Sequence, residues 1–100
     1  MKLIDLVFRM NYTLVQGSLE QEISEVIYDS RKAVPGCIFL CMPGAVTDGH
    51  DYIPEVLEKG AAALVVEREV AVPKDVTVLR VENARLALAE LAAAWYGHPA

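Results

Sequence analysis

The sequence lacks any apolar run long enough to cross a membrane. Hydrophobic residues make up 54% of its 100 residues, yet no stretch approaches the roughly 18 consecutive apolar residues of a membrane-spanning helix. The first ten residues carry Asp5 and Arg9 inside their apolar stretch and contain no small-residue cleavage site, so they do not resemble a signal peptide. We therefore expect one soluble globular domain with no membrane partner.

Cysteine and histidine are scarce. The two cysteines, Cys37 and Cys41, lie four positions apart in a segment that reads as a strand, where a rise of ~3.3 Å per residue separates their Cα atoms by about 13 Å. A disulfide requires roughly 4.4 to 6.8 Å, so we expect two small buried thiols in a reducing cytoplasm. The two histidines, His50 and His98, are far apart in the sequence, and no metal site is predicted.

Positive charge is also limited. Nine basic residues stand against 14 acidic ones, which gives a formal net charge of −5, and the only adjacent basic pair is Arg31-Lys32. Proteins that bind nucleic acid usually have a basic surplus or a basic stripe, so we expect no nucleic-acid partner. An anionic ligand would have to be held by backbone N–H groups and one or two cations.

Strand patterns alternate with helical patterns along the chain. Helices are predicted over residues 2–10, 51–59 and 84–96, and strands over residues 12–15, 25–28, 37–42, 62–67 and 76–81. Asp51 and Asn83 are the predicted N-caps of the second and third helices. The continuous apolar runs of the third and fourth strands are typical of strands buried on both faces. We therefore predict an α/β fold, a two-layer or three-layer sandwich with a small, largely parallel sheet.

The first candidate site is Asp29-Ser30-Arg31-Lys32, at the carboxyl end of a predicted strand. Ligands of open α/β sheets bind beyond the carboxyl ends of the strands. A hydroxyl, backbone N–H groups and two cations at this place could hold phosphate oxygens. The alternative is an ordinary turn, in which Asp29 or Ser30 bonds its own backbone and Arg31 is solvated.

The second candidate site is the loop Gly44-Ala-Val-Thr-Asp-Gly-His50. Its glycines allow a close approach of the backbone to a ligand, and the following helix start offers free N–H donors. The loop matches neither the dinucleotide-binding fingerprint nor the phosphate-binding loop of nucleoside triphosphatases. The alternative is a surface loop in which Asp48, Asp51 and His50 act as caps.

No catalytic residues are predicted, because no nucleophile stands beside a base and no carboxylates are paired at a fitting spacing. Two alternatives stay open at this point. One is a stand-alone enzyme that uses Asp48 and Asp51 as acid and base. The other is a non-enzymatic α/β interaction module whose apolar last helix, with Leu86 to Trp95 on its surface, docks on a partner.

The order of several short motifs resembles the N-terminal domain of the Mur ligase family. The resemblance covers about residues 25 to 99. The motifs are Asp29-Ser30-Arg31, Val34-Pro-Gly-x-Ile-Phe39, Gly44-x-x-x-Asp-Gly-His-Asp-Tyr-Ile53, Lys59-Gly-Ala61 before Leu64-Val-Val-Glu67, Ala84-Arg85-x-Ala87, and Ala92-x-x-Trp-Tyr-Gly-His-Pro99. Each motif is weak alone, and their order and spacing together are specific.

The resemblance implies a domain that binds the UDP end of a UDP-N-acetylmuramoyl-peptide. Ser30 then contacts the nucleotide and Tyr28 lines the site. The resemblance places nucleotide contacts at Ala45, Val46 and Thr47. Some relatives carry His-Gln-Ala at these positions and this chain does not, so contacts through the backbone are expected. Cys37 stands where the family often has Asp, so a polar interaction at that position is not expected. The predicted site is completed by neighbouring residues of both segments, namely Asp29, Arg31, Asp48, Gly49 and His50.

The resemblance also implies that the whole protein is an ATP-dependent, amide-forming ligase of peptidoglycan synthesis in the cytoplasm. ATP phosphorylates a substrate carboxylate, and an amine attacks the acyl phosphate. The Asp-Ser-Arg motif and the ending Trp95-Tyr-Gly-His-Pro99 favour the member that adds the third residue of the stem peptide, meso-diaminopimelate or lysine. The D-alanyl-D-alanine-adding member is the alternative.

Residues 1–100 correspond to a single domain in this comparison, and the sequence stops just after a motif, as at a domain boundary. ATP and magnesium belong to a central domain of the family, against which this domain would pack. The amino-acid pocket involves a C-terminal domain. The chain by itself is therefore expected to need no cofactor or metal and to bind substrate without catalysis.

Overall fold

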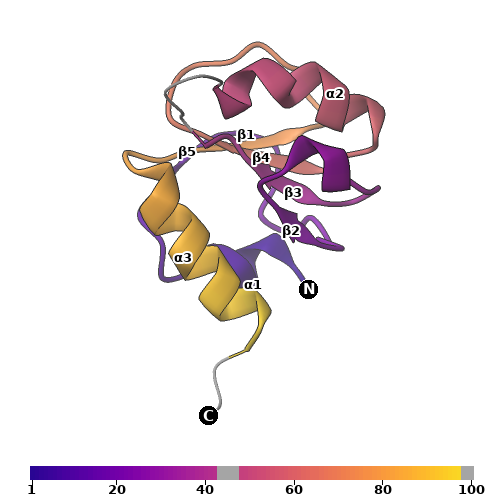
Figure 1. Ribbon diagram of the computed structural model, residues 1–100. Coiled ribbons are helices and arrows are strands. Elements are labelled where there is room, and N and C mark those ends of the chain that lie inside the picture. Colours follow the sequence, from indigo (N-terminus) through magenta and orange to yellow (C-terminus); the bar gives the residue numbers. More distant parts are fainter. Residues whose placement is uncertain (43–47, 98–100) are drawn as a thin grey trace.

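A five-stranded sheet forms the middle layer of the molecule (Figure 1). The computed structural model describes residues 1–42 and 48–97. In chain order the elements are α1 (Leu3–Val7), β1 (Thr13–Gln16), β2 (Val26–Ile27), the 3₁₀ helix η1 (Ser30–Lys32), β3 (Ile38–Leu40), the 3₁₀ helix η2 (Gly49–Tyr52), α2 (Ile53–Glu58), β4 (Ala63–Val66), β5 (Thr77–Arg80) and α3 (Ala84–Trp95).

The sheet has the strand order β1-β5-β4-β3-β2. The four strands from β2 to β5 are parallel to one another, and β1 runs antiparallel to β5 at one edge. In the register of the sheet Phe39 is the partner of Leu64, and Leu64 is the partner of Val78. The predicted small, largely parallel sheet is thus confirmed, although the four parallel strands are shorter than predicted and β1 begins one residue later.

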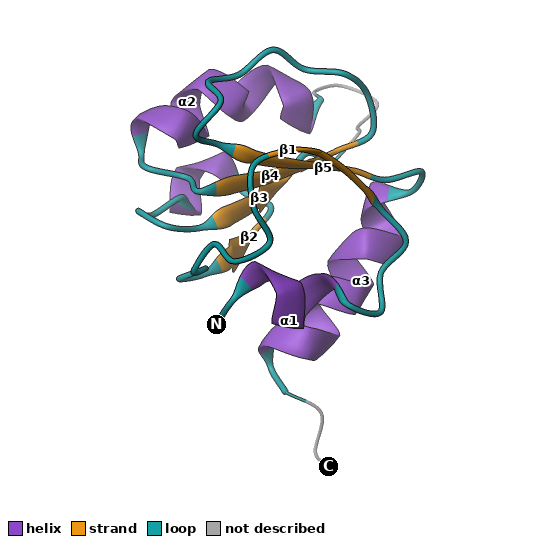
Figure 2. Cartoon of the chain, turned by 180° about the vertical axis from the view of Figure 1, so that it is seen from behind, coloured by secondary structure: helices purple, strands orange, loops and turns teal. Residues whose placement is uncertain are grey.

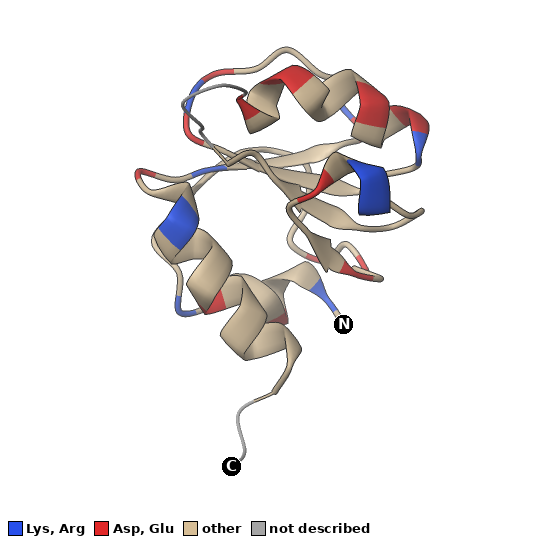
Figure 3. Ribbon diagram, viewed as in Figure 1, with Lys and Arg blue, Asp and Glu red and all other residues tan. Residues whose placement is uncertain are grey.

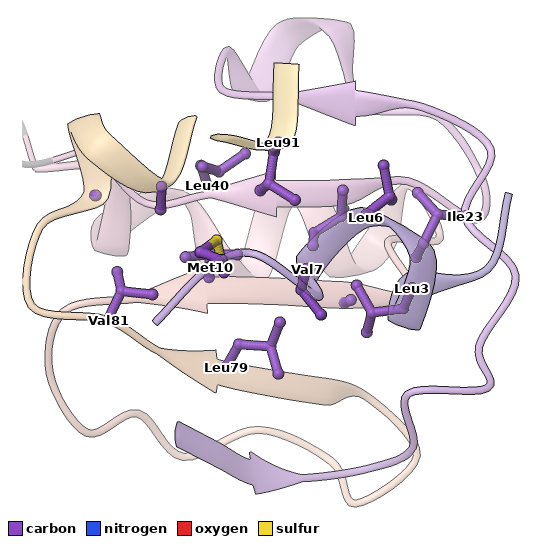
Figure 4. Close-up of a cluster of buried hydrophobic side chains, with 14 residues drawn as sticks. Leu3, Leu6, Val7, Met10, Ile23, Leu40, Leu79, Val81 and Leu91 are labelled. Atoms are coloured by element: carbon purple, nitrogen blue, oxygen red, sulfur yellow. The ribbon is translucent and has the colours of Figure 1, made fainter. Parts of the chain in front are cut away.

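Helices cover both faces of the sheet, so the fold is a three-layer sandwich. The helix α2 lies on one face, and α1 and α3 lie together on the other (Figures 1 and 2). Successive strand residues alternate between the two layers. Leu40 and Leu79 join α1 and α3 in one buried cluster, part of which is drawn in Figure 4. Phe39 and Leu64 belong to the cluster beneath α2.

The start of α2 differs from the prediction. Asp51 was expected to cap this helix, but the aspartate that caps is Asp48, whose side chain accepts a hydrogen bond from the backbone N–H of His50 at the start of η2. A 3₁₀ turn therefore precedes α2, which begins at Ile53 without a side-chain cap and carries Pro54 in its first turn, where proline is tolerated.

The other helix ends follow the sequence more closely. Asn83 caps α3 as predicted, its side-chain oxygen accepting from the N–H of Leu86 at 3.1 Å. The first helix ends at Val7, shorter than predicted, because the chain turns there and leaves Phe8 exposed on the surface.

Few charged residues lie along α3 (Figure 3). One side of the helix packs on the sheet through buried residues that include Leu91, α1 packs beside it, and Leu86 stays 58% exposed. Within the described ranges, no helix has the length and hydropathy required to span a membrane.

Both cysteines are free thiols with no exposed surface. Cys37 precedes β3 and Cys41 follows it, and both belong to the cluster beneath α2. Burial raises the pKa of the Cys37 thiol, and it raises the pKa of Cys41 to about 12. The prediction of two separate buried thiols is confirmed.

Replacement of Leu91 by alanine tests the packing of α3 on the sheet. Leu91 has no exposed surface, so Leu91→Ala should lower the free energy of unfolding by about 2 to 5 kcal/mol through lost burial and a residual cavity. Leu86→Ala, on the exposed side of the same helix, should change it by no more than about 0.5 kcal/mol. Urea denaturation of both variants measures the difference. Equal losses would mean that α3 does not pack as described.

Candidate functional site

The turn after β2 is organised by a local ion pair. The Asp29 carboxylate accepts a hydrogen bond from the backbone N–H of Arg31 at 3.0 Å, and from the guanidinium Nε and Nη2 of the same residue at 3.1 and 2.9 Å. The side-chain hydrogen bond from Arg31, followed by the backbone hydrogen bond, lowers the pKa of Asp29 to about 2. Its interaction with Asp29 raises the pKa of Arg31. These two residues therefore neutralise each other and shape the turn.

Ser30 differs from its neighbours in being buried, with 7% of its surface exposed. Its carbonyl oxygen accepts hydrogen bonds from the Lys59 ammonium at 3.0 Å and from the Ala33 N–H at 3.3 Å. Its hydroxyl forms no hydrogen bond with another described residue and is nevertheless not sealed from solvent. A ligand at this place can therefore use the hydroxyl as donor or acceptor.

Lys59 was not among the residues predicted for the site. It is the C-cap residue directly after α2, and its ammonium donates a hydrogen bond to the Ser30 carbonyl. One feature of the sequence pointed to Lys59, because it belongs to the Lys59-Gly-Ala61 motif, one of the motifs on which the family resemblance rests. Nothing in the sequence linked that motif to Ser30, which lies 29 residues earlier.

Asp48 and His50 form the second part of the candidate site. One carboxylate oxygen of Asp48 accepts from the backbone N–H of His50 at 2.9 Å and lies 2.6 Å from the ring Nδ1, and the other accepts from Arg68 at 2.7 Å. The ring Nε2 of His50 accepts from the backbone N–H of Glu67 at 3.1 Å. This pattern requires a neutral ring with its proton on Nδ1.

Through these contacts Asp48 holds His50 and Arg68 in place, and we call this the anchor role of Asp48. The backbone hydrogen bond from His50, then the ring hydrogen bond, and to a smaller extent the bond from Arg68 lower the pKa of Asp48 to about 2. A carboxyl with such a pKa is a poor general acid near neutral pH. The geometry therefore gives no support to a stand-alone enzyme built on Asp48 and Asp51.

Gly49 has a structural reason for lacking a side chain. Its N–H donates to the carbonyl of Met42 at 2.8 Å. A Cβ at this position would lie 2.5 Å from the backbone nitrogen of Met42 and 2.9 Å from Cys41. The close approach that the glycine permits is therefore to the protein's own backbone after β3.

The two candidate segments follow neighbouring parallel strands, β2 and β3. Tyr28 to Arg31 and Asp48 to His50 are therefore placed along the same, carboxyl edge of the sheet. Tyr28 is 61% exposed beside the buried Ser30. The predicted contact residues Ala45, Val46 and Thr47 lie outside the described residues.

A groove of about 630 Å³ lies next to the carboxyl ends of β4 and β5, between β1 and the start of α3, and none of the described residues of the predicted site lines it. Its charged lining consists of Arg9 and Arg80 together with Glu67, Glu82 and Glu90. Because acidic groups outnumber basic ones, the groove does not favour an anionic ligand. Among residues 1–42 and 48–97, no three His, Cys, Asp or Glu side chains are grouped so as to hold a metal.

Comparison with known proteins identifies related sequences. The family model described as "Mur ligase family, catalytic domain" matches residues 22–96. The UDP-N-acetylmuramoyl-L-alanyl-D-glutamate–2,6-diaminopimelate ligase of Clostridioides difficile is 42% identical over 99% of the chain and 20% of its own length. The UDP-N-acetylmuramyl-tripeptide synthetase of a Roseiflexus species is 57% identical over 78% of the chain and 16% of its own length.

Solved structures give the same picture of the fold. MurF from Acinetobacter baumannii superposes with a TM-score of 0.80 at 28% sequence identity, covering 93% of this chain and 20% of the other. The chain spans about a fifth of the length of the curated relatives that match it over nearly all its residues.

The anchor role of Asp48 predicts an acid-dependent loss of stability. Because the pKa of Asp48 is lowered from 3.8 to about 2, the ionised carboxylate stabilises the fold above about pH 4, and this contribution disappears as the pH falls to about 2. Asp48→Asn should cost about 1 kcal/mol at pH 7, and the difference from the wild type should shrink between pH 4 and pH 2.

Urea denaturation across this pH range measures the effect. Asp75→Asn is the matched control, because Asp75 is exposed and forms no ion pair within the described ranges. If the difference in free energy of unfolding between the Asp48 variant and the wild type stayed constant down to pH 2, the anchor role of Asp48 would be contradicted.

Proposed function

Because the chain belongs to the Mur ligase family, we propose that it binds the uridine diphosphate end of UDP-N-acetylmuramoyl-L-alanyl-D-glutamate. The binding site proposed is the carboxyl edge of the sheet at β2 and β3. It includes Ser30 and Tyr28, and it extends to the loop with Ala45, Val46 and Thr47. In this proposal the chain forms the substrate-binding, N-terminal domain of a longer ligase.

The observation that supports this site most is that the Ser30 hydroxyl has no hydrogen bond to another described residue. The residue is largely buried, yet its hydroxyl bonds no other described residue and is open to solvent, so a ligand can reach it without breaking an internal hydrogen bond. Ser30 follows the carboxyl end of β2, and α/β folds bind their ligands beyond the carboxyl ends of their strands. In this proposal a hydrogen bond to the nucleotide replaces the contact of this hydroxyl with water.

Tyr28 suits a nucleoside. Its side chain is 61% exposed and lies two residues before Ser30. An exposed aromatic ring provides a surface on which a pyrimidine base can stack. We propose that Tyr28 and Ser30 act on the same ligand, one through its ring and the other through its hydroxyl.

The charge of the diphosphate has to be met within an acidic chain. The net charge is −5, and Arg31 is already paired with Asp29. Backbone N–H groups are therefore the most suitable donors for the phosphate oxygens. This requirement agrees with the assignment of backbone contacts to Ala45, Val46 and Thr47.

We propose that the complete protein adds the third residue of the stem peptide. Support comes from the names of the curated relatives, a 2,6-diaminopimelate ligase at 42% identity over 99% of the chain and a tripeptide synthetase at 57% identity over 78% of it. The fold neighbour MurF, at 28% identity, supports the D-alanyl-D-alanine-adding enzyme as a second candidate. The higher identities favour the first.

In this proposal, chemistry and cofactors belong to the remainder of the ligase. ATP and magnesium supply carboxylate activation there. The chain contains no phosphate-binding loop with its lysine, and the part we propose for it is substrate binding and orientation. Two buried free thiols suit a reducing cytoplasm.

Calorimetric titration tests the proposal directly. The chain should bind UDP-N-acetylmuramoyl-L-alanyl-D-glutamate and UDP, and it should not bind ATP. Ser30→Ala should weaken binding about fivefold, the effect of one ordinary hydrogen bond of roughly 1 kcal/mol. Ser24→Ala is the control, because the Ser24 hydroxyl donates to the Pro35 carbonyl at the opposite end of β2.

Two results would argue against the proposal. Binding of ATP alone would replace the uridine-nucleotide site by an adenine-nucleotide site. Equal weakening by the Ser30 and Ser24 variants would mean that Ser30 has no specific role in the site.

A further inference from the structure

We propose that Lys59 is a positioning residue of the binding site, and that it acts through Ser30 without touching the substrate. The inference rests on the proposed function and adds a residue to it. It is based on a contact between the end of α2 and the 3₁₀ turn η1, which lie far apart in the sequence and meet beside the carboxyl end of β2.

The contact is a charged hydrogen bond. The Lys59 ammonium donates to the Ser30 carbonyl oxygen at 3.0 Å, in a partly buried position. Glu55, one helical turn earlier, lies 3.7 Å from the same ammonium and restrains it. Hydrogen bonds from an ionised donor are stronger than those between neutral groups. This bond therefore holds the backbone of Ser30 more firmly than an ordinary turn contact would.

A second hydrogen bond between the end of α2 and the β2–β3 connection lies one residue after Lys59. The carbonyl of Gly60 accepts a hydrogen bond from the N–H of Gly36 at 2.7 Å. Gly60 has a φ of +92°, and a Cβ there would lie 3.0 Å from the Cα of Pro35. The end of α2 thus holds the β2–β3 connection at two places, at Ser30 through Lys59 and at Gly36 through Gly60.

The contacts of Asp29 with Arg31 shape the turn but do not involve the Ser30 carbonyl, which depends on other hydrogen bonds. The strand β2 has two residues and η1 has three, and such short 3₁₀ segments have poor hydrogen-bond geometry. Without Lys59, the one hydrogen bond that the described residues would still give the Ser30 carbonyl is the 3.3 Å bond from the N–H of Ala33. The hydroxyl would then sample more orientations, and substrate binding would have to restore the order at a cost in affinity.

Substitutions of Lys59 test the inference in the whole chain. Lys59→Met keeps the apolar stem and removes the donor, whereas Lys59→Arg keeps a charged donor. Calorimetry with UDP-N-acetylmuramoyl-L-alanyl-D-glutamate should show about three- to tenfold weaker binding for the Met variant and recovery of most of the affinity for the Arg variant. Lys74→Met makes the same change at an exposed lysine without an ion pair in the described ranges, and it should bind like the wild type.

A double-mutant cycle with Ser30→Ala separates positioning from general destabilisation. If Lys59 acts through the Ser30 hydroxyl, Lys59→Met should cost little further affinity once that hydroxyl is absent. An equal fold-loss in both backgrounds would overturn the inference. Thermal unfolding of each variant identifies those that are not folded at the titration temperature.

The outcomes for the two proposals are distinct. A wild-type chain that binds the UDP compound, with a Met variant that binds equally well, would overturn the role of Lys59 and leave the proposed function intact. A folded wild-type chain that binds no UDP compound would overturn both.

Discussion

The burial of β3 and β4 on both faces is the constraint on which the rest of the structure depends. Their residues are apolar without interruption, so neither face of the central sheet can meet water. Helices must cover both sides, α2 on one and α1 with α3 on the other (Figure 1). The described residues of both candidate segments follow β2 and β3 along the chain, toward the carboxyl edge at which α/β folds bind their ligands.

The central elements were predictable because their signals are local. Continuous apolar runs at residues 37–42 and 62–67 specified the buried strands, and Asn83 specified the start of α3. Which aspartate caps the turn before α2 could not be decided from the local sequence. Asp48 and Asp51 both fit the pattern, but the ring of His50 is fixed by the N–H of Glu67 after β4, and that contact places Asp48 at the cap.

In the candidate site, too, some residues could be located from local sequence and others only from contacts across the fold. Tyr28 to Arg31 are consecutive, so a single motif located them together. The structure gives several of the predicted residues framework roles, with Asp48 and His50 joining loop to strand and Gly49 closing on Met42. Lys59 was not predicted, because it meets Ser30 through a side-chain hydrogen bond between segments that lie far apart in the sequence. Such contacts leave no spacing pattern in a sequence.

The two thiols have a practical consequence. Cys37 and Cys41 flank the central strand, have no exposed surface and stay protonated because burial raises their pKa values. An alkylating reagent attacks only an accessible thiolate, so modification of either residue requires the sheet to open. The rate of alkylation by a small reagent therefore reports the free energy of opening at the centre of the molecule. The chain thus carries two intrinsic probes of its native-state dynamics, and no label has to be engineered into it.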